Sequence, residues 1–319
     1  MIPLLVIAGP TASGKTALAI RLAKMLDGEV ISADSMQVYK EMNIGTAKPD
    51  AEEMEGIPHH LLDIVEPETD FSLEQFSARC HAAIRSVHVR GKLPILAGGT
   101  GLYIDTVIEN RSLSENSFDP AVRLALETDW EREGGPAIYE RLKAIDPAAA
   151  DSLHPHEKRR ILRALEIYMT TGETKTAHLQ KKSEKIYEYF IFALELPREI
   201  LYNRINRRVD AMLEAGLLQE VEEIYGRLRG TKHTALQGVG YKELIWYLEG
   251  RASFAEAVSL LKRNTRRLAK RQMTWFRANP SIHWLDGLME PDQLAETCAK
   301  IFLEAQAQRK QENCDEEIV

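Results

Sequence analysis

Cysteine is scarce in this chain: Cys80, Cys298 and Cys314 are the only three among 319 residues. They lie too far apart for a disulfide framework or a zinc knuckle, which suggests a reducing compartment. The chain also lacks a long hydrophobic run, because the opening apolar stretch from Ile2 to Ala8 is short and carries neither a basic leader nor a cleavage site. We interpret it as a buried strand and expect a cytoplasmic protein without a membrane partner.

An excess of positive charge is missing as well. Lys and Arg number 41 against 48 Asp and Glu, which gives a formal net charge of −7. Any polyanionic partner would therefore need a local basic surface. Hydrophobic residues make up 44% and charged residues 28%, ordinary values that exclude a disordered or membrane-spanning chain. The length suits about two domains.

The first third of the chain alternates short apolar runs with helix-length segments. The runs end at Ala8, Ala33 and Ala97, the last followed directly by Gly98 to Gly101. This rhythm is typical of a parallel sheet with crossover helices, whose ligands gather at the carboxyl ends of the strands. We predict an α/β fold, namely a P-loop NTPase-like parallel sheet flanked by helices, with an all-helical insertion domain.

The insertion follows from a change of pattern. From Asn110 to Lys185 the periodicity is helical without a convincing strand, and Tyr187 to Leu196 is typical of a strand that returns to the first domain. Helices are expected at residues 198–216 and 254–277, and the polar end from Glu304 is expected to fray. We therefore predict a discontinuous core domain, residues 1–110 and 186–319, and a helical insertion, residues 111–185.

A phosphate-binding motif follows the first strand. The pattern G-x-x-x-x-G-K-[ST] is matched, before a helical run, by Gly9, Pro10, Thr11, Ala12, Ser13, Gly14, Lys15 and Thr16. Backbone N–H groups and the helix N-terminus suit a di- or triphosphate. Lys15 supplies a positive charge, and the Thr16 hydroxyl suits Mg²⁺, the cofactor we expect.

Such a loop does not define the reaction. Hydrolysis of ATP or GTP, or phosphoryl transfer, would require a hydrophobic strand ending in an Asp that helps to hold Mg²⁺. Asp34, in VISADS, is the only early candidate, and it is either that metal partner or something else. In both cases the end of its strand should place it in the same crevice as Lys15.

The ordered set of motifs resembles the bacterial tRNA dimethylallyltransferases. The shared segments are GPTASGKT at 9–16, SADSMQVY at 32–39, NIGTAKP at 43–49, PHHLLD at 58–63, GGTGLY at 98–103, RRILR at 159–163, GVGY at 238–241 and KRQMTW at 270–275. The resemblance implies transfer of a dimethylallyl group from dimethylallyl diphosphate to N6 of the adenosine 3′ of the anticodon, position 37, with release of diphosphate. The loop would then hold a diphosphate leaving group.

This chemistry gives the candidate residues distinct roles. An exocyclic adenine amine is a poor nucleophile, so a proton acceptor is needed, and Asp34 fits that role, which contributes typically about 10² to 10⁴ in rate. Lys15, the loop amides, Mg²⁺ at Thr16 and an arginine would neutralise the developing diphosphate charge. We predict that this arginine is Arg208. It lies beside an apolar stripe that includes Ile205 and Val209, and the resemblance places it against the diphosphate.

Arg204 and Arg207, on the same predicted helix, are alternative candidates for contact with the diphosphate.

Two basic segments are candidate tRNA surfaces. Lys262 to Arg277 contains seven Lys or Arg and no acid, and three arginines cluster in the insertion; solvated faces are the alternative for both. The resemblance implies tRNA contacts at Asp34, Ser35, Met36, Gln37, Thr100, Arg123, Arg159, Arg160, Ile161, Leu162, Arg163, Gln237, Gly238, Val239, Gly240, Tyr241 and Lys242. The expected partners are the tRNA anticodon stem-loop and dimethylallyl diphosphate, and we expect a monomer.

Other readings of the same residues remain open. A P-loop kinase of small metabolites would explain the loop but would leave the basic helices without a role. An adenylate isopentenyltransferase would accept free AMP, ADP or ATP. A third alternative is a non-enzymatic RNA-binding ATPase.

Adjacent His59 and His60 point to opposite sides of an extended segment, so we expect structural roles for them. The aromatic residues Tyr241, Trp246, Tyr247 and Trp275 are expected in the core.

Overall fold

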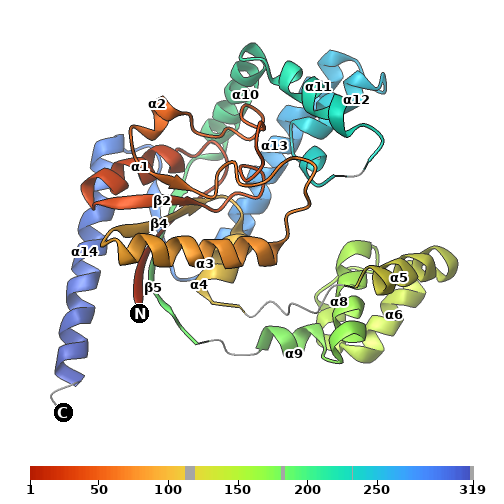
Figure 1. Ribbon diagram of the computed structural model, residues 1–319, viewed down its shortest axis with the longest axis horizontal. Helices are drawn as coiled ribbons and strands as arrows, with labels where there is room; N and C mark the ends of the chain where they lie inside the picture. The colour runs from red at the N-terminus through yellow and green to blue at the C-terminus, as the bar shows by residue number, and fades with distance from the viewer. Residues whose placement is uncertain (112–118, 181–183, 232, 317–319) are drawn as a thin grey trace. The chain divides into compact units, whose positions relative to one another are not determined.

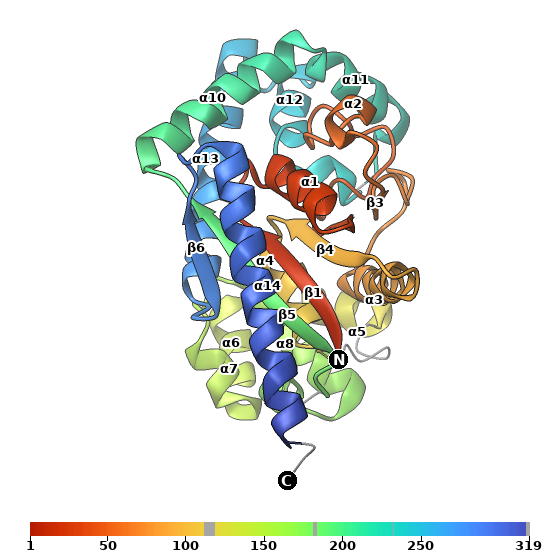
Figure 2. The ribbon, with the colours of Figure 1, turned by 90° about the vertical axis from the view of Figure 1, so that its left-hand side faces the viewer.

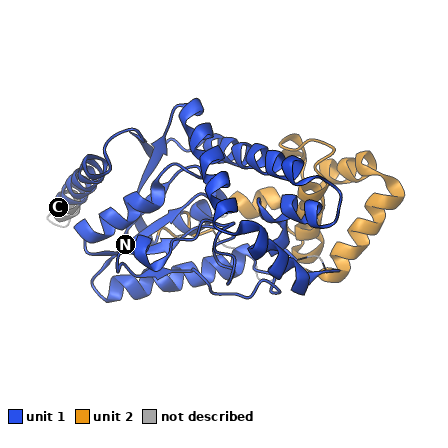
Figure 3. Ribbon diagram, turned by 90° about the horizontal axis from the view of Figure 1, so that it is seen from above, with its two compact units in different colours: residues 1–108, 186–319 blue, residues 109–185 orange. Residues whose placement is uncertain are grey.

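The computed structural model describes residues 1–111, 119–180, 184–231 and 233–316. They form two compact units, residues 1–108 with 186–319 and residues 109–185, drawn in blue and orange in Figure 3. None of the helices in the described ranges combines the length and the hydropathy that a membrane span requires.

The first unit is built on one parallel sheet. Within the described ranges its strands follow the order β3 (His59–His60), β2 (Gly28–Ser32), β4 (Leu93–Gly98), β1 (Ile2–Ala8), β5 (Tyr187–Glu195) and β6 (Ile282–Asp286). The predicted α/β parallel sheet is confirmed, and β5 is the returning strand. Because β1, β2 and β4 are parallel neighbours, their carboxyl ends meet at one edge.

Helices cover both faces of this sheet (Figure 1). Leu5 and Ile7 of β1 pack against α1 (Lys15–Met25) and α14 (Pro291–Glu316), whereas Leu4 and Val6 face the core with α3 (Leu73–Val89) and α4 (Gly101–Ile108). In Figure 2, α14 crosses in front of β1 and β5. This alternation along β1 produces two apolar layers, as a strand buried on both faces requires.

The remaining helices of the first unit surround the carboxyl edge of the sheet. They are α2 (Ala51–Met54), α10 (Arg198–Glu214), α11 (Leu217–Leu228), the 3₁₀ turn η1 (Ala235–Gln237), α12 (Tyr241–Leu248) and α13 (Phe254–Arg277). The helices predicted at 198–216 and 254–277 are confirmed as α10 and α13.

The expectation that the chain frays from Glu304 is wrong, because α14 continues to Glu316. Its packing explains the continuation: Leu294, Cys298 and Phe302 are buried against α1 and the sheet. Further along, Arg309 lies over the Phe190 ring, 5.8 Å from its centroid.

The second unit consists of helices and the turns that connect them, with no strand among its described residues. It contains α5 (Pro120–Glu133), α6 (Gly135–Ile145), α7 (Pro147–Asp151), α8 (Lys158–Thr171) and α9 (Lys175–Gln180). Leu126, Ile138 and Leu165 belong to its own apolar core. Asp146 caps α7 by accepting from the Ala149 amide at 3.1 Å, and it also accepts from the Thr176 hydroxyl of α9 at 2.6 Å.

The carboxylate of one buried residue on β2 joins this strand to β3 and to the end of α3. Glu29 is 7% exposed and accepts from His60 Nε2 at 2.6 Å and from Arg90 Nη2 at 2.5 Å. Burial opposes its ionisation, but the hydrogen bonds from Arg90 and His60 outweigh burial and lower the pKa of Glu29. Its contribution to stability is therefore present above its unfolded pKa and is lost as the pH falls through the lower folded value.

We predict that Glu29→Gln lowers the melting temperature at neutral pH, because the amide cannot pair with Arg90 and His60 as an anion does. The difference from the wild type should shrink below about pH 4.5, the ordinary pKa of this carboxyl. Thermal unfolding across this range measures the difference. Glu296→Gln, an exposed site on α14, is the matched control. A difference independent of pH would contradict the assignment.

Candidate active site

The predicted phosphate loop connects β1 to α1. Gly9 (φ 152°) and Gly14 (φ 99°) adopt backbone angles that favour glycine, and a Cβ on Gly9 would lie 2.9 Å from Ser13 Oγ. Gly14 begins α1 without a side-chain cap, so the first helix amides remain open to an anion. Ser13 Oγ is also buried without a protein partner among the described residues.

Lys15 is held at the same loop by donating from Nζ to the Pro10 carbonyl at 3.3 Å. Burial lowers the pKa of Lys15 to about 8, while the charge of Asp34 raises it and that of Arg208 lowers it. The side chains of these three charged residues line one cavity.

Asp34 stands just after β2. Its Oδ1 accepts from the backbone amides of Met36 at 2.8 Å and Gln37 at 3.4 Å, which fixes the carboxylate. Its Oδ2 has no hydrogen-bond partner in the part of the chain that the structure describes. The carboxylate is therefore oriented yet retains an oxygen able to accept a proton.

Arg208 of α10 faces the same cavity, whereas Arg204 and Arg207 are exposed. Burial lowers the pKa of Arg208, and the charges of Glu53 and Asp34 oppose that effect. The structure thus distinguishes Arg208 from its two sequence rivals by orientation.

A cavity of about 140 Å³ lies between these groups. The sequence-predicted residues that line it are Thr11, Ala12, Lys15, Thr16, Asp34, Met36, Gln37, Arg208, Gly238, Val239, Gly240 and Tyr241. Gly9, Pro10, Ser13 and Gly14 complete the loop beside it without lining it. Ser35 and Thr100 adjoin it through a hydrogen bond from the Ser35 amide to Thr100 Oγ1, 3.3 Å long. Gln237 and Lys242 flank the Gly238–Tyr241 turn outside the lining.

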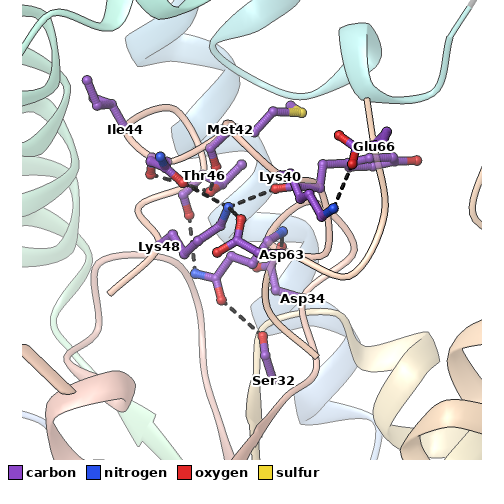
Figure 4. A network of polar contacts seen from close by, with 12 residues as sticks. Ser32, Asp34, Lys40, Met42, Ile44, Thr46, Lys48, Asp63 and Glu66 are labelled. Atoms are coloured by element: carbon purple, nitrogen blue, oxygen red, sulfur yellow. Dashed lines mark hydrogen bonds and ion pairs between the residues drawn. The ribbon is translucent and has the colours of Figure 1, made fainter. Parts of the chain in front are cut away.

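A buried lysine that the sequence analysis did not assign organises the segment after Asp34. Lys48, with 4% of its side chain exposed, donates from Nζ to the Tyr39 carbonyl (2.7 Å), to Asn43 Oδ1 (2.9 Å) and to Asp63 Oδ1 (2.5 Å). Figure 4 shows Lys48 beside Asp63 in this network. Its only sequence signal was its place in the NIGTAKP motif.

The side chain of Gln37 forms hydrogen bonds that hold the same segment together next to the cavity. Its Nε2 donates to the carbonyls of Ala47 (3.1 Å) and Thr46 (3.3 Å), and its Oε1 accepts from Ser32 Oγ at 3.0 Å. The side chain of Gln37 is thus committed to three protein groups, and its amide N–H to Asp34.

Glu220 of α11, to which the sequence analysis gave no role, holds the turn at residues 43–45 in place. It accepts from the amides of Asn43, Ile44 and Gly45 at 2.7 to 2.9 Å and from the Tyr241 hydroxyl at 2.5 Å. A Cβ on Gly45 would lie 2.6 Å from the Tyr241 ring, so only glycine admits this packing. Burial raises the pKa of Tyr241 above its usual value.

Several predicted contacts and core positions need correction. Ile161 and Leu162 are buried, both at 0% exposure, so their side chains support the fold and do not present a surface to tRNA. Tyr241, 1% exposed, packs on Gly45 at the cavity wall. Conversely, the expectation that neighbouring aromatics lie in the core is wrong for Trp246, Tyr247 and Trp275, which are 46%, 36% and 39% exposed. Trp246 and Tyr247 fall on the outer side of the short helix α12, and Trp275 donates to Asp105 Oδ2 at 2.8 Å.

The two adjacent histidines have separate structural partners. His60 contacts Glu29, and His59 donates from Nδ1 to the Ile57 carbonyl, 2.8 Å away, while its ring lines the cavity. Burial lowers the pKa of His59. Across the described ranges, no cluster of three His, Cys, Asp or Glu suits a metal ion.

Two arginines of the second unit, Arg123 and Arg163, lie near a buried acid. Glu166, 1% exposed, pairs with Arg163 at 2.8 Å and lies 4.0 Å from Arg123. Arg160 pairs with Glu157 at 2.9 Å, and Arg159 is exposed. Arg123 also donates to Glu127 Oε1 at 2.9 Å, so three of these four arginines pair with acids, and the predicted tRNA surface of this unit stays a prediction.

The basic residues of α13 fall into two groups, those that contact an acid or another polar side chain and those that are exposed without an ion pair in the described part of the chain. Arg277 pairs with Glu195 at 2.6 Å and Lys262 with Asp210 at 2.5 Å, whereas Arg266 donates to Asn206 Oδ1 at 2.7 Å. The exposed cations without an ion pair among the described residues are Arg263, Arg267, Lys270 and Arg271. The stripe is therefore less uniformly basic than its sequence predicts, because neighbouring helices and strands supply acids.

Comparison with known proteins identifies the family. The family model described as IPP transferase matches residues 37–279. The tRNA dimethylallyltransferase of Carboxydothermus hydrogenoformans is 46% identical over 304 residues, covering 95% of this chain and 97% of that protein. The crystal structure of a tRNA isopentenylpyrophosphate transferase from Bacillus halodurans matches with a TM-score of 0.73 and 42% identity, covering 98% of this chain and 100% of that one.

A eukaryotic relative extends the comparison. The structure of a eukaryotic dimethylallyltransferase acting on tRNA matches with a TM-score of 0.78 and 34% identity, covering 90% of this chain and 74% of that one. The resemblance noted in the sequence motifs is confirmed by these matches. Together with the phosphate loop, Asp34 and Arg208 gathered at one cavity, they show that this chain belongs to the tRNA dimethylallyltransferase family.

Proposed function

We propose that the protein transfers a dimethylallyl group from dimethylallyl diphosphate to N6 of adenosine 37 in tRNA and releases diphosphate, acting as a monomer in the cytoplasm. One observation carries this proposal: an oriented carboxylate, Asp34, shares a cavity with a phosphate loop and two half-buried cations, Lys15 and Arg208. Membership of the family supports tRNA as the acceptor.

The donor diphosphate would lie on the open amides at the start of α1. As the C–O bond breaks, negative charge grows on the diphosphate, and Lys15 and Arg208 are already in place to stabilise it. Since they need little reorganisation, they favour the transition state over the bound substrate. The apolar side chains of Val209, Met212 and Leu261 line the same cavity and suit a five-carbon group.

Mg²⁺ fits the same end of the cavity. Thr16 lines it beside Lys15, and its hydroxyl has no hydrogen-bond partner within the described ranges. We propose Thr16 as the protein ligand of a magnesium ion that would otherwise be held by diphosphate oxygens and water, and that adds positive charge at the leaving group.

The acceptor adenosine would approach from the Asp34 side. The free Oδ2 of Asp34 would take the N6 proton as the amine attacks, while Ser35, Met36, Gln37 and Thr100 would surround the base. A base in a single-stranded anticodon loop can leave its stack at a cost of about a few kcal/mol, less than a paired base requires.

We propose the helical unit, residues 109–185, as the tRNA-binding insertion. Arg123, Arg159, Arg160 and Arg163 would contact phosphates, while the buried Ile161 and Leu162 hold their helix in place. In the first unit, the Gln237 to Lys242 segment would contact the anticodon loop through its backbone and its exposed ends.

Incubation of the purified protein with dimethylallyl diphosphate, Mg²⁺ and unmodified tRNA tests the proposal. Mass analysis of the digested tRNA should show N6-dimethylallyladenosine, with diphosphate released in equal amount. Parallel reactions with labelled ATP and with free AMP examine the two rival enzymes. Phosphoryl transfer without tRNA prenylation would identify a kinase, and prenylation of AMP alone an adenylate isopentenyltransferase.

We predict that Asp34→Asn lowers the single-turnover rate by about 10² to 10⁴, because the amide keeps the acceptor for the Met36 amide but cannot take the N6 proton. Rapid quench with saturating substrates measures this rate. Glu296→Gln makes the same carboxylate-to-amide change on the exposed face of α14 and should leave it unaltered. Wild-type rates in Asp34→Asn would remove the base from the mechanism.

Thr16→Val preserves the shape of the side chain but removes the proposed metal ligand. The Mg²⁺ concentration needed for half-maximal activity should rise about tenfold or more, as expected for loss of one oxygen ligand. Thr16→Ser restores the hydroxyl and should restore the wild-type requirement. The proposed ligand role fails if the Val variant titrates with Mg²⁺ as the wild type does.

Combined replacement of Arg159, Arg160 and Arg163 by Ala should raise the KM for tRNA and reduce its dependence on salt, because fewer counterions are released on binding. The KM for dimethylallyl diphosphate should not change. Titrations at several salt concentrations measure both effects, with Lys300→Ala on α14 as a charge-removal control. An unchanged salt slope would exclude these arginines from the interface.

A further inference from the structure

The side-chain amide of Gln272, on α13, joins two parts of the active site that are distant in sequence. Its Oε1 accepts from the backbone amide of Thr11 in the phosphate loop at 2.9 Å, and its Nε2 donates to the Gly99 carbonyl at 3.0 Å. Both ends of the amide are thus hydrogen-bonded. Gln272 also lines the cavity.

From Gly99 the contacts continue to the segment that carries Asp34. The Thr100 amide donates to the Ala33 carbonyl at 3.3 Å, and Thr100 Oγ1 accepts from the Ser35 amide at 3.3 Å. An unbroken series of hydrogen bonds and short chain segments therefore runs from the loop that would hold the diphosphate to the carboxylate that would take the proton. Gln272 is the one link contributed by a helix outside both segments.

Two glycines, Gly99 and Gly101, leave room for the side chains that α13 places against the 98–101 turn. A Cβ on Gly99 would lie 2.4 Å from Gln272 Nε2, so the glycine leaves room for the amide. One turn further along α13, the Trp275 ring packs so closely on Gly101 that a Cβ there would lie 2.3 Å from it. The helix thus holds the 98–101 turn at two successive points.

We propose that Gln272 is a positioning residue that sets the spacing between the phosphate loop and the Asp34 segment, and thereby aligns donor and acceptor for transfer. The inference rests on the proposed function and adds to it a residue that need not touch either substrate. Transfer requires the amine, the allylic carbon and the leaving oxygen in line, and a misplacement of about 1 Å costs up to about 10² in rate.

The first test compares Gln272→Ala with Gln293→Ala, an exposed site on α14. Single-turnover rates at saturating substrate, normalised to the folded fraction, should fall about 10- to 100-fold in Gln272→Ala only. The KM for tRNA and the affinity for pyrophosphate should stay within about threefold of wild type, because misalignment affects the transition state more than binding.

Two outcomes would overturn the inference. A lower melting temperature with an unchanged normalised rate would make Gln272 a fold-stabilising residue. A weaker affinity for pyrophosphate with an unchanged rate at saturation would make it part of the diphosphate cradle alone. If the wild type itself transfers no dimethylallyl group, the proposed function has failed, so the two failures are distinguishable.

A double-mutant cycle provides a second, independent test. Gly99→Ala should displace the Gln272 amide and lower the rate by itself, whereas Gly226→Ala on α11, where a Cβ meets nothing within 4 Å, should not. In Gln272→Ala the closest clash of the added methyl of Gly99→Ala is removed, and the remaining close contact is with the Gly9 carbonyl oxygen at 3.3 Å, which requires a shift of a few tenths of an ångström. The double variant should therefore lie within about threefold of Gln272→Ala. Multiplication of the two single losses would contradict the proposed link.

Discussion

The close approach of two strand ends is the constraint on which this site depends. Gly98, the last residue of β4, lies so near the backbone of Ala33 that a Cβ would stand 2.2 Å from the Ala33 carbonyl oxygen, and the Ala33 amide donates to the Ala97 carbonyl at 2.8 Å. This contact continues the β2–β4 pairing beyond the strands. Asp34 is thereby fixed at the same edge at which β1 passes into the phosphate loop.

The charges at that edge act because they are partly desolvated and held in place before substrate binds. Lys15 and Arg208 pay a desolvation cost that lowers their pKa values, and Asp34 compensates part of it. A diphosphate would complete this balance, since a cationic pair beside a helix N-terminus favours an anion strongly where water is scarce. The same arrangement leaves the carboxylate a free oxygen, so a leaving group and a proton can be received within one cavity.

The sequence predicted what is local and periodic. The phosphate loop, the strand before Asp34 and the choice of Arg208 all follow from motif spacing or helical periodicity. Glu220 and Gln272 could not be assigned in this way, because each binds backbone groups that only tertiary folding brings near. Lys48 could not be assigned either, because its three acceptors lie on an irregular segment without a periodic pattern. The exposure of Trp246 was likewise unpredictable, since composition does not tell which face of a short helix its neighbours leave open.

The central claim is that diphosphate and acceptor meet in the cavity between the phosphate loop and Asp34. A crystal structure with Mg²⁺ and a thiolo analogue of dimethylallyl diphosphate tests it most directly. We predict that the diphosphate lies against the amides at the start of α1, between Lys15 and Arg208, with the allylic carbon directed toward Asp34 Oδ2. An analogue bound elsewhere, or with its allylic carbon directed away from Asp34, would contradict the account.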